Sequence, residues 1–408
     1  MEKKQICVIG GGAAGMMAAI MAARAGAAVT LLEHNEKTGR KLLATGNGRC
    51  NLTNRYQSRE CYHSQKPETA WGILQQFSLT DTLEFFSEIG VSVKEKNGYF
   101  YPASMQASSV QELLEMEARY RKVKIKCREN VKEIRPEQTA SCNPSFLVRT
   151  ETWQYEADAV ILACGSRASQ IEGADSSGYT LAKSLGLSVE KPLPALVPLM
   201  GKEKYFSKWA GTRIEGRISL VAEKKVLNTQ EGKLQLTDYG ISGIPVFQCS
   251  GLVARLLDKG IEVTAVLDFL PSCNLSETEQ LLKSRRKQCP YKSTAALLTG
   301  LFPKKLCDVL MENKPEIPAL AARIKEFPIK IKKTKPFENA QVCTGGVSLT
   351  EVHPHTLESR KVPGLYLAGE LLDTDGICGG YNLQWAWTSG YLAGRAAAQE
   401  QKGIEVHA

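Results

Sequence analysis

The stretch QICVIGGGAAGMMAAIMAARAGAAVTLLE, residues 5–33, decides the fold of this chain. It opens with a short β-rich apolar run at 5–9, turns through glycines and alanines, and continues as a run of small residues and methionines typical of a helix. A second apolar run, which ends at Glu33, closes it. The order strand, turn, helix, strand predicts a parallel βαβ unit, and therefore an α/β fold with a Rossmann-like domain.

The turn in this unit has the pattern of a dinucleotide site, G-x-G-x-x-G, at Gly10, Gly12 and Gly15. The first glycine permits the tight turn, the second lets a pyrophosphate approach the backbone, and the third lets the helix pack closely on the sheet. The helix N-terminus offers N–H groups and a positive dipole end to the phosphates. Glu33 lies 18 residues beyond Gly15, where a carboxylate accepts hydrogen bonds from ribose hydroxyls. An acid there favours a free 2′-hydroxyl, so the sequence predicts FAD or NAD rather than NADP.

A long basic segment after this unit, GRKLLATGNGRCNLTN at 39–54, favours FAD over NAD. It has neither the period of a helix nor the alternation of a strand, so we expect a loop that lies along an extended cofactor. Loops of this length are uncommon unless they are functional. The predicted contacts are the cations Arg40, Lys41 and Arg49 for phosphates, Gly46 and Gly48 for close approach, and Thr45, Asn47 and Asn51 for neutral hydrogen bonds.

The far end of the chain supplies the second half of the predicted site. A strand at 364–370 ends in Gly369 and Glu370, and a glycine-rich turn then leads into a helix that begins near Tyr381 and Asn382. The N-terminal dipole of that helix would stabilise negative charge on the ring of a reduced flavin. Both ends of the chain must therefore meet on one sheet. A strand at 129–135 places the backbone of Val131 within reach of the adenine.

Between these ends the chain makes a long excursion. A proline-rich linker at 191–200 precedes alternating segments at 216–238 and 261–271, which predict antiparallel strands, and helical segments at 274–288 and 293–326. No second G-x-G-x-x-G is found, so NADH or NADPH would act as a transient electron donor at the open flavin face. The predicted domains are an FAD-binding domain at 1–190 plus 336–408, an inserted β-rich domain at 191–273 and a small helical subdomain at 274–335.

Five blocks together resemble the BaiN/YhiN-like flavoproteins, also labelled the aminoacetone oxidase family of FAD-binding enzymes. The blocks are GGGAAG (10–15), GRKLLATGNGRCNLTN (39–54), LTDYGISGIPVFQCSG (236–251), CTGGV (343–347) and GLYLAGELLDTDGICGGYNLQWAWTSG (364–390). The resemblance implies non-covalent FAD in a fold of the two-dinucleotide-binding-domain type. The residues that match its nucleotide-binding positions are Ala13, Ala14, Glu33, Arg40, Lys41, Val131, Glu370, Asp373, Asn382 and Leu383.

The resemblance also implies an activity, because the family includes an enzyme that reduces conjugated double bonds of 3-oxo bile-acid intermediates. We therefore expect an FAD-dependent oxidoreductase that reduces C=C bonds of a hydrophobic 3-oxo substrate, such as a 3-oxo-4,6-diene bile acid, with NADH. The alternatives are an amine or aminoacetone oxidase that uses oxygen, an RNA-modifying flavoprotein and a non-catalytic flavin-binding regulator. The sequence departs from the family at NGYFYP (97–102), where Tyr99 replaces a frequent arginine. This weakens the inference of an anionic substrate bound by arginine and is compatible with a flatter, more apolar ligand.

The residue that delivers the proton for such a reduction is not identified by any motif. Tyr99, Tyr101, Tyr381 and Cys378 are candidates by their position, although packing or backbone spacing accounts for each of them as well. A protein acid at this point is expected because the flavin transfers only the hydride.

Composition limits the remaining classes. The 408 residues carry a formal net charge of +9, without a dense Lys/Arg tract interleaved with aromatics, so nucleic acid is not favoured as a partner. The twelve cysteines include no CxxC pair, and the N-terminus has no signal-peptide pattern, so we expect free thiols in the cytoplasm. No apolar run reaches the ~18 residues of a membrane span. The five histidines do not cluster, and we expect no metal site.

Overall fold

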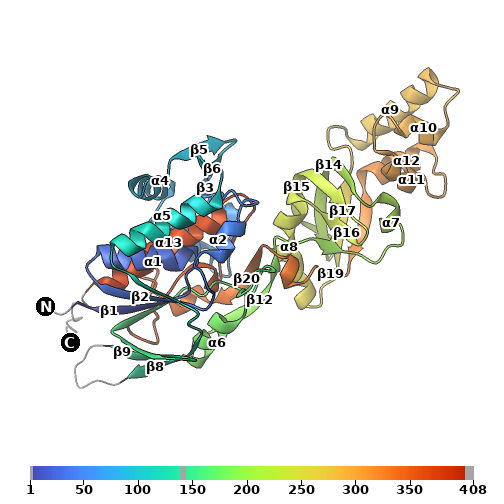
Figure 1. Cartoon of the computed structure of the whole chain (residues 1–408). Helices are drawn as coiled ribbons and strands as arrows, with labels where there is room; N and C mark the ends of the chain where they lie inside the picture. Colours follow the sequence, from blue (N-terminus) through green and yellow to red (C-terminus); the bar gives the residue numbers. More distant parts are fainter. Residues whose placement is uncertain (1–2, 138–143, 400–408) are drawn as a thin grey trace. The chain divides into compact units, whose positions relative to one another are not determined.

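The computed structural model describes residues 3–137 and 144–399 of the chain (Figure 1). The chain forms two compact units, each with its own core. The first comprises Met1–Pro192 with Val342–Ala408 and is called here the nucleotide unit. The second, Leu193–Gln341, is called the inserted unit. The predicted division of this insertion into separate β-rich and helical domains stays a prediction.

The nucleotide unit is built on a five-stranded parallel sheet in the order β21-β11-β1-β2-β7. Its strands are β1 Gln5–Ile9, β2 Ala28–Glu33, β7 Lys124–Cys127, β11 Ala159–Leu162 and β21 Leu365–Leu367. The three central strands are nearly continuous apolar runs because both faces of the sheet are covered. One edge strand comes from the C-terminal part of the chain, so the predicted joining of the two ends on one sheet is confirmed.

Helices α1 Ala13–Arg24, α5 Ala107–Tyr120 and α13 Tyr381–Ala398 lie together on one face of this sheet (Figure 1). Two glycines let α13 approach α1 backbone to backbone. A Cβ atom at Gly390 would lie 2.4 Å from the carbonyl oxygen of Ala14, and one at Gly394 would lie 2.3 Å from that of Ala18. Small residues at this contact therefore fix the C-terminal helix beside the first one.

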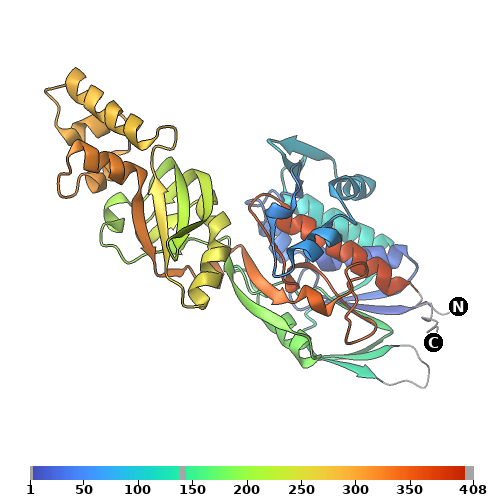
Figure 2. The same ribbon diagram turned by 180° about the vertical axis from the view of Figure 1, so that it is seen from behind.

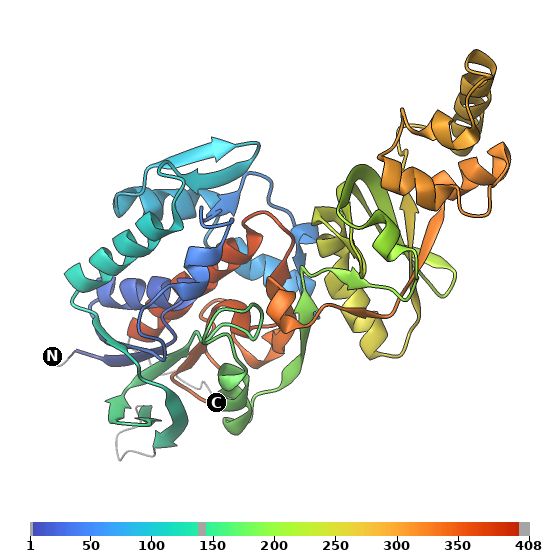
Figure 3. The ribbon, with the colours of Figure 1, turned by 45° about the vertical axis from the view of Figure 1, so that its right-hand side comes forward.

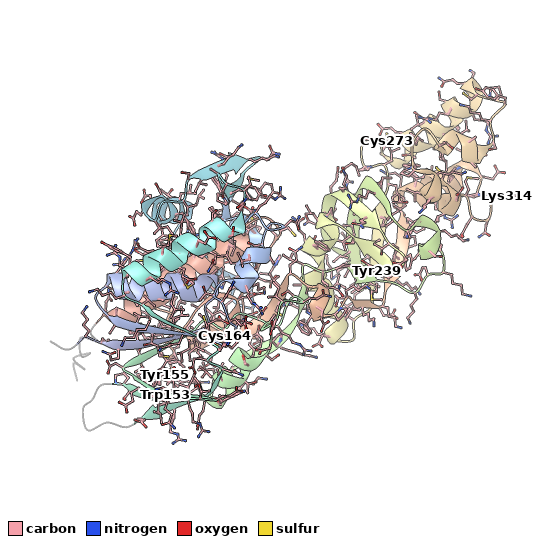
Figure 4. The ribbon with its side chains drawn as sticks, in the orientation of Figure 1. Trp153, Tyr155, Cys164, Tyr239, Cys273 and Lys314 are labelled. Atoms are coloured by element: carbon pink, nitrogen blue, oxygen red, sulfur yellow. The ribbon has the colours of Figure 1, made fainter. Side chains whose placement is uncertain are left out.

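The opposite face is covered by an antiparallel meander of β8 Val131–Glu137, β9 Ser145–Thr150 and β10 Gln154–Ala157 (Figure 2). Trp153 and Tyr155 lie at the β9–β10 end of it, as Figure 4 shows. The other elements of this unit are small sheets and short helices: α2 Arg40–Ala44, β3 Thr53–Asn54, β4 Tyr62–His63, α3 Pro67–Leu74, α4 Leu79–Glu88, β5 Val93–Lys96, β6 Tyr99–Pro102, α6 Ser177–Ser184, β20 Val342–Val347 and β22 Asp375–Gly376. Strand β12 Val189–Ala195 begins in this unit and ends in the inserted unit.

The inserted unit consists of a seven-stranded antiparallel sheet and six helices (Figure 3). The sheet order is β18-β17-β14-β15-β16-β13-β19. The strands are β13 Leu199–Met200, β14 Thr212–Ala222, β15 Lys225–Leu236, β16 Gly240–Ser242, β17 Val263–Asp268, β18 Phe327–Ile331 and β19 Lys333–Thr334. The helices are α7 Phe206–Trp209, α8 Ile244–Asp258, α9 Leu275–Gln288, α10 Thr294–Leu298, α11 Lys304–Leu310 and α12 Ile317–Lys325.

Two local expectations are wrong. The basic segment at 39–54 is not a loop throughout, because it contains α2 and β3. Gly39 at φ 74° turns the chain into α2, and the good helix formers that follow complete one short helix. The proline-rich segment at 191–200 is not a plain linker, because it contributes β12 and β13. β12 pairs only with β20, and a strand with an unpaired edge tolerates residues that lack an N–H.

Two findings bear on the predicted environment. The eleven cysteines in the described part of the chain are free thiols, and Cys142 lies outside it. Among the described residues, no helix combines the length and apolar character that a bilayer crossing requires.

The contact between α1 and α13 can be tested by one added methyl group. We expect Gly394→Ala to lower the free energy of unfolding by about 1–3 kcal/mol, because the Cβ would overlap a backbone oxygen that cannot move freely. The matched control is Gly72→Ala, in the exposed part of α3 with nothing within 4 Å of the added atom. This variant should gain about 0.5–1 kcal/mol from helix propensity. Equal denaturant midpoints for the two variants would contradict the close packing.

Candidate functional site

The glycine turn after β1 has the shape that the sequence predicts for it. Gly10 adopts φ 104°, and a Cβ there would lie 2.5 Å from the carbonyl oxygen of Ala163. A Cβ on Gly15 would lie 1.8 Å from the carbonyl oxygen of Gly10, so α1 begins in direct contact with the turn. A Cβ on Gly12 would meet nothing within 4 Å. Space is therefore open at the one glycine expected to face the pyrophosphate, and α1 begins there without a side-chain cap.

Glu33 lies at the end of β2 with only 6% of its surface exposed. Its Oε2 accepts a hydrogen bond of 2.7 Å from the Gly11 N–H, and its Oε1 accepts two of 2.8 Å from Asn35. The carboxylate thus links the glycine turn to the segment after β2. A ribose placed at this turn would find a fixed acceptor, in the place where the Rossmann pattern requires one.

The segment at 39–54 is held in a conformation that few sequences could adopt. Gly46, Asn47, Gly48 and Cys50 all have positive φ, between 54° and 79°. Asn47 and Cys50 carry side chains in this left-handed region, which is uncommon and is concentrated at functional sites. Arg49 donates from Nε to the Gly46 carbonyl and lies over the Tyr101 ring at 5.6 Å. Arg49 therefore stabilises the conformation of the segment in this structure. Its predicted contact with the cofactor stays a prediction.

The predicted phosphate-binding cations pair with carboxylates. Lys41 Nζ lies 2.5 Å from Glu370 Oε2 and 3.3 Å from Ser166 Oγ. Arg40 pairs with Glu172 on the surface, and its hydrogen bond lowers the pKa of that carboxyl group. Lys41 and Glu370 are 329 positions apart in the chain, so the fold brings two predicted site residues into contact.

Three hydrogen bonds tie the same segment to α13 and to the turn that precedes it. Thr53 Oγ1 donates to Gln384 Oε1 at 2.7 Å, the Trp387 indole donates to the Leu52 carbonyl at 3.0 Å, and Asn54 Nδ2 donates to the Gly379 carbonyl at 3.0 Å. The bonds that Thr53 and Trp387 make are buried. The first helical turn of α13 and the basic segment therefore form one fixed structure.

The C-terminal block lies against the beginning of α1. Gly369 has φ 75°, and a Cβ there would lie 2.7 Å from the Cβ of Ala14. Asn382 makes two hydrogen bonds with Gly376 and so fixes the turn that begins α13. Its Oδ1 accepts from the Gly376 N–H at 2.9 Å, and its Nδ2 donates to the Gly376 carbonyl at 2.8 Å. Gly380 starts that helix without a side-chain cap.

The remaining predicted residues are spread around this centre. Asp373 accepts a hydrogen bond of 2.8 Å from the Gln65 N–H, and Leu383 is buried on α13. Val131 begins β8 on the other face of the sheet, and it connects to the site through Glu129, whose N–H donates to the Glu33 carbonyl at 2.9 Å.

The four candidate proton donors are less suited to that role than their positions suggest. Burial raises the pKa of the Tyr381 phenol far above neutrality and that of the Cys378 thiol to about 12. Tyr99 lies on β6 with its ring edge close to Gly379, and Tyr101 holds the Arg49 guanidinium. The assignment of any of these four residues as the proton donor therefore stays a prediction.

These features fit FAD. Two uncapped helix N-termini and an open glycine suit phosphates and a reduced ring. Asn51 is 8% exposed, and its Oδ1 has no hydrogen-bond partner in the described part of the chain. A buried acceptor without a donor is costly, and a cofactor that supplies one would remove the cost. Among the described residues no group of three or more His, Cys, Asp and Glu side chains could hold a metal ion.

Sequence reasoning missed several residues that organise the site. Gln384 is 2% exposed and links Thr53 and Thr82 to α13, yet only its place directly after Asn382 and Leu383 hints at a role. Glu172 and Ser166, the partners of Arg40 and Lys41, belong to no motif. His63 and Asp375 form a pair that no spacing in the sequence reveals.

The role of Glu33 can be tested by its loss. We expect Glu33→Ala to weaken FAD binding by about 1.5–3 kcal/mol, because a buried, well-paired carboxylate is removed from the ribose position. That corresponds to a roughly tenfold to 150-fold rise in Kd, measured by titrating apoprotein with FAD. Glu36→Ala is the control, since it removes the same charge from an exposed carboxylate paired with Arg128. Equal affinity of both variants would remove Glu33 from the site.

Comparison with known proteins places this geometry in a family. Residues 4–396 match the family model described as HI0933-like protein Rossmann domain. The chain is 47% identical to the 3-dehydro-bile acid delta(4,6)-reductase of Clostridium scindens, over 97% of this chain and 99% of that protein. It is 29% identical to the ribosomal RNA dihydrouridine synthase of Escherichia coli, over 96% and 97% of the two chains.

A solved structure shares the fold. The 3-ketosteroid delta1-dehydrogenase of Sterolibacterium denitrificans superposes with a TM-score of 0.52 at 12% identity, covering 98% of this chain and all of that one. The predicted α/β Rossmann fold and the assignment to the oxidoreductases are confirmed by these comparisons. With its nearly full-length match to the family model and 47% identity to the reductase, the chain belongs to the HI0933-like family of Rossmann-domain flavoproteins.

Proposed function

We propose that this protein is an FAD-dependent reductase of conjugated C=C bonds in a hydrophobic 3-oxo substrate, such as a 3-oxo-4,6-diene bile acid. NADH or NADPH is the proposed electron donor. The observation that carries the proposal is the 47% identity to the bile-acid delta(4,6)-reductase over almost the full length of both chains. The similarity to the dihydrouridine synthases, at 29%, is much lower.

The positions of the residues that would hold the cofactor support the proposed function. Glu33 would accept from the ribose, the α1 N-terminus and Lys41 would bind the pyrophosphate, and the α13 N-terminus would face the ring. Bound FAD supplies two-electron hydride chemistry. The protein then has to orient the substrate, exclude water and deliver one proton.

Binding of the pyrophosphate at Lys41 would require a change in one ion pair, Lys41–Glu370. Glu370 lies against Lys41 at 2.5 Å, and its other oxygen accepts from the Cys343 N–H at 3.1 Å. Phosphate oxygens would replace Glu370 as the partner of Lys41 and free one carboxylate oxygen for the hydroxyls of the ribityl chain. The exchange conserves the number of charge-assisted bonds, so it costs little.

The proposed function predicts a visible, reversible colour change. We expect the anaerobic FAD-loaded protein to bleach with NADH and to recover its yellow absorbance when a 3-oxo-4,6-diene bile acid is added. The saturated 3-oxo bile acid is the control and should leave the reduced spectrum unchanged. Bleaching by aminoacetone but not by NADH would instead indicate the oxidase. A protein that retains FAD but bleaches with neither donor would be a flavin-binding regulator.

A second function, RNA modification, is favoured by one observation. Residues 193–341 carry 24 of the 52 Lys and Arg but only 15 of the 43 Asp and Glu, so the excess of +9 lies entirely in the inserted unit. Near the end of α9, the exposed side chains of Arg286, Lys287 and Lys292 accompany Tyr291, which is 81% exposed. Cations beside an open aromatic ring suit single-stranded RNA.

This alternative predicts salt-dependent RNA binding through that patch. If RNA is the substrate, the double variant Lys287→Ala with Tyr291→Ala should weaken binding of a ribosomal RNA fragment and reduce the slope of log affinity against log salt. The control is Lys96→Ala with Tyr120→Ala, which removes the same two residue types from exposed positions of the nucleotide unit. Identical binding by both double variants in filter retention would exclude the patch as an RNA site.

A further inference from the structure

His63 and Asp375 form a pair that the proposed cofactor contacts leave unexplained. They face each other across the antiparallel strands β4 and β22, and His63 Nδ1 lies 3.2 Å from Asp375 Oδ2. The carboxylate side chain is 2% exposed, whereas the imidazole is 44% exposed. A buried acid is thus joined to a histidine that can reach other molecules.

The carboxylate has little else to satisfy it. Asp375 Oδ1 is buried and has no hydrogen-bond partner in the described part of the chain. The neighbouring acid Asp373 is engaged by the backbone and side chain of residues 64–65, at 2.8 Å from the Gln65 N–H and 3.4 Å from the Ser64 hydroxyl. A buried carboxylate is expensive unless it is paired, and His63 Nδ1 at 3.2 Å is the partner of Asp375 Oδ2.

The pair lies beside the turn that begins α13. Gly376 follows Asp375 and is clamped by Asn382 in the first turn of the helix. The Ile377 N–H donates to the Cys61 carbonyl at 2.9 Å, which locks this turn to the strand of His63. The rings of Tyr62 and Tyr381 meet edge to face, with centroids 5.6 Å apart. The histidine is therefore held close to the helix N-terminus that would face the flavin ring.

The nearby alternatives hold their protons too tightly. Burial raises the pKa of Cys378 to about 12 and that of Tyr381 further still. The Tyr62 pKa is also raised well above its ordinary value by burial. Histidine is the side chain that ordinarily exchanges its proton near neutral pH.

We propose that His63 donates the proton in the reduction and that Asp375 is its positioning residue. The inference rests on the proposed function. Bound FAD, once reduced, would supply the hydride for one new C–H bond, and the π electron pair of the substrate would take the proton from His63 Nε2 to form the other. The N–H bond of the imidazolium breaks, leaving neutral imidazole, and water restores its proton after product release. Asp375 keeps its negative charge throughout, holding Nδ1–H and thereby the tautomer with Nε2 toward the substrate.

The decisive experiment separates the two half-reactions. FAD-loaded protein is reduced with dithionite, mixed anaerobically with a 3-oxo-4,6-diene bile acid in D₂O, and followed by flavin reoxidation and by NMR of the product. For His63→Gln we expect reoxidation to slow by about 10²–10⁴-fold, with bleaching by NADH unchanged. Wild type should place deuterium on one face of the product carbon, whereas protonation by water in the variant should give both epimers. Asp375→Asn should show a smaller loss in the same step, and the exposed control His355→Gln none.

A measurement on the unmodified protein guards against misfolded variants. Diethyl pyrocarbonate acylates neutral imidazole, so a saturated bile acid bound to the FAD-loaded protein should protect His63 from this reagent, as read by peptide mass spectrometry. Asp375→Asn should increase the rate of acylation in the free protein, because the carboxylate that occupies Nδ1 is lost.

The outcomes distinguish this inference from the function on which it rests. If the reduced wild type is not reoxidised by the dienone, the proposed function fails and the proton donor fails with it. If the wild type is reoxidised, but His63→Gln matches its rate and deuterium stereochemistry, the reductase stands and the dyad is overturned. Absence of protection of His63 in the wild type would also overturn the dyad.

Discussion

The contact of α1 with α13 is the constraint on which the site depends. Backbone carbonyls of Ala14 and Ala18 occupy the places where side chains at Gly390 and Gly394 would lie. This close approach sets the end of β21 and the start of α13 beside the glycine turn of β1. Gly369 then touches Ala14, and two helix N-termini, separated by most of the chain, can serve one ligand. Hydrophobic burial stabilises the core, but the absence of two Cβ atoms decides the distance.

Electrostatics gives the site a second layer of organisation. The carboxylate of Glu33 accepts a hydrogen bond from the glycine turn, and Lys41 pairs with Glu370 from the C-terminal part of the chain. These contacts give the Glu33 carboxylate and the Lys41 ammonium group polar partners, which a partly buried charge needs. An anionic cofactor would compete for the cation and not for the Glu33 carboxylate. Binding can therefore rearrange Lys41 and Glu370 while the turn that holds the phosphates stays in place.

Charge is divided unequally between the two units. The nucleotide unit has as many acidic as basic residues, and residues 281–335 of the inserted unit hold 14 Lys and Arg against 4 Asp and Glu. Within the family, relatives are named for a bile-acid reductase and for ribosomal RNA dihydrouridine synthases. A neutral cofactor-binding unit with a separately charged insertion is compatible with substrates of very different size.

The sequence by itself determined the fold class, the glycine turn, Glu33 and the C-terminal strand and helix, because each depends on local spacing along the chain. It also identified the basic segment at 39–54, although α2 and β3 within it were missed, since a short helix after a left-handed glycine has too few residues to show a period. Only the tertiary structure decided the pairs Lys41–Glu370, Thr53–Gln384 and His63–Asp375, whose members are 329, 331 and 312 positions apart. Contacts over such separations depend on how strands and helices pack in three dimensions, and no periodicity in the sequence encodes them.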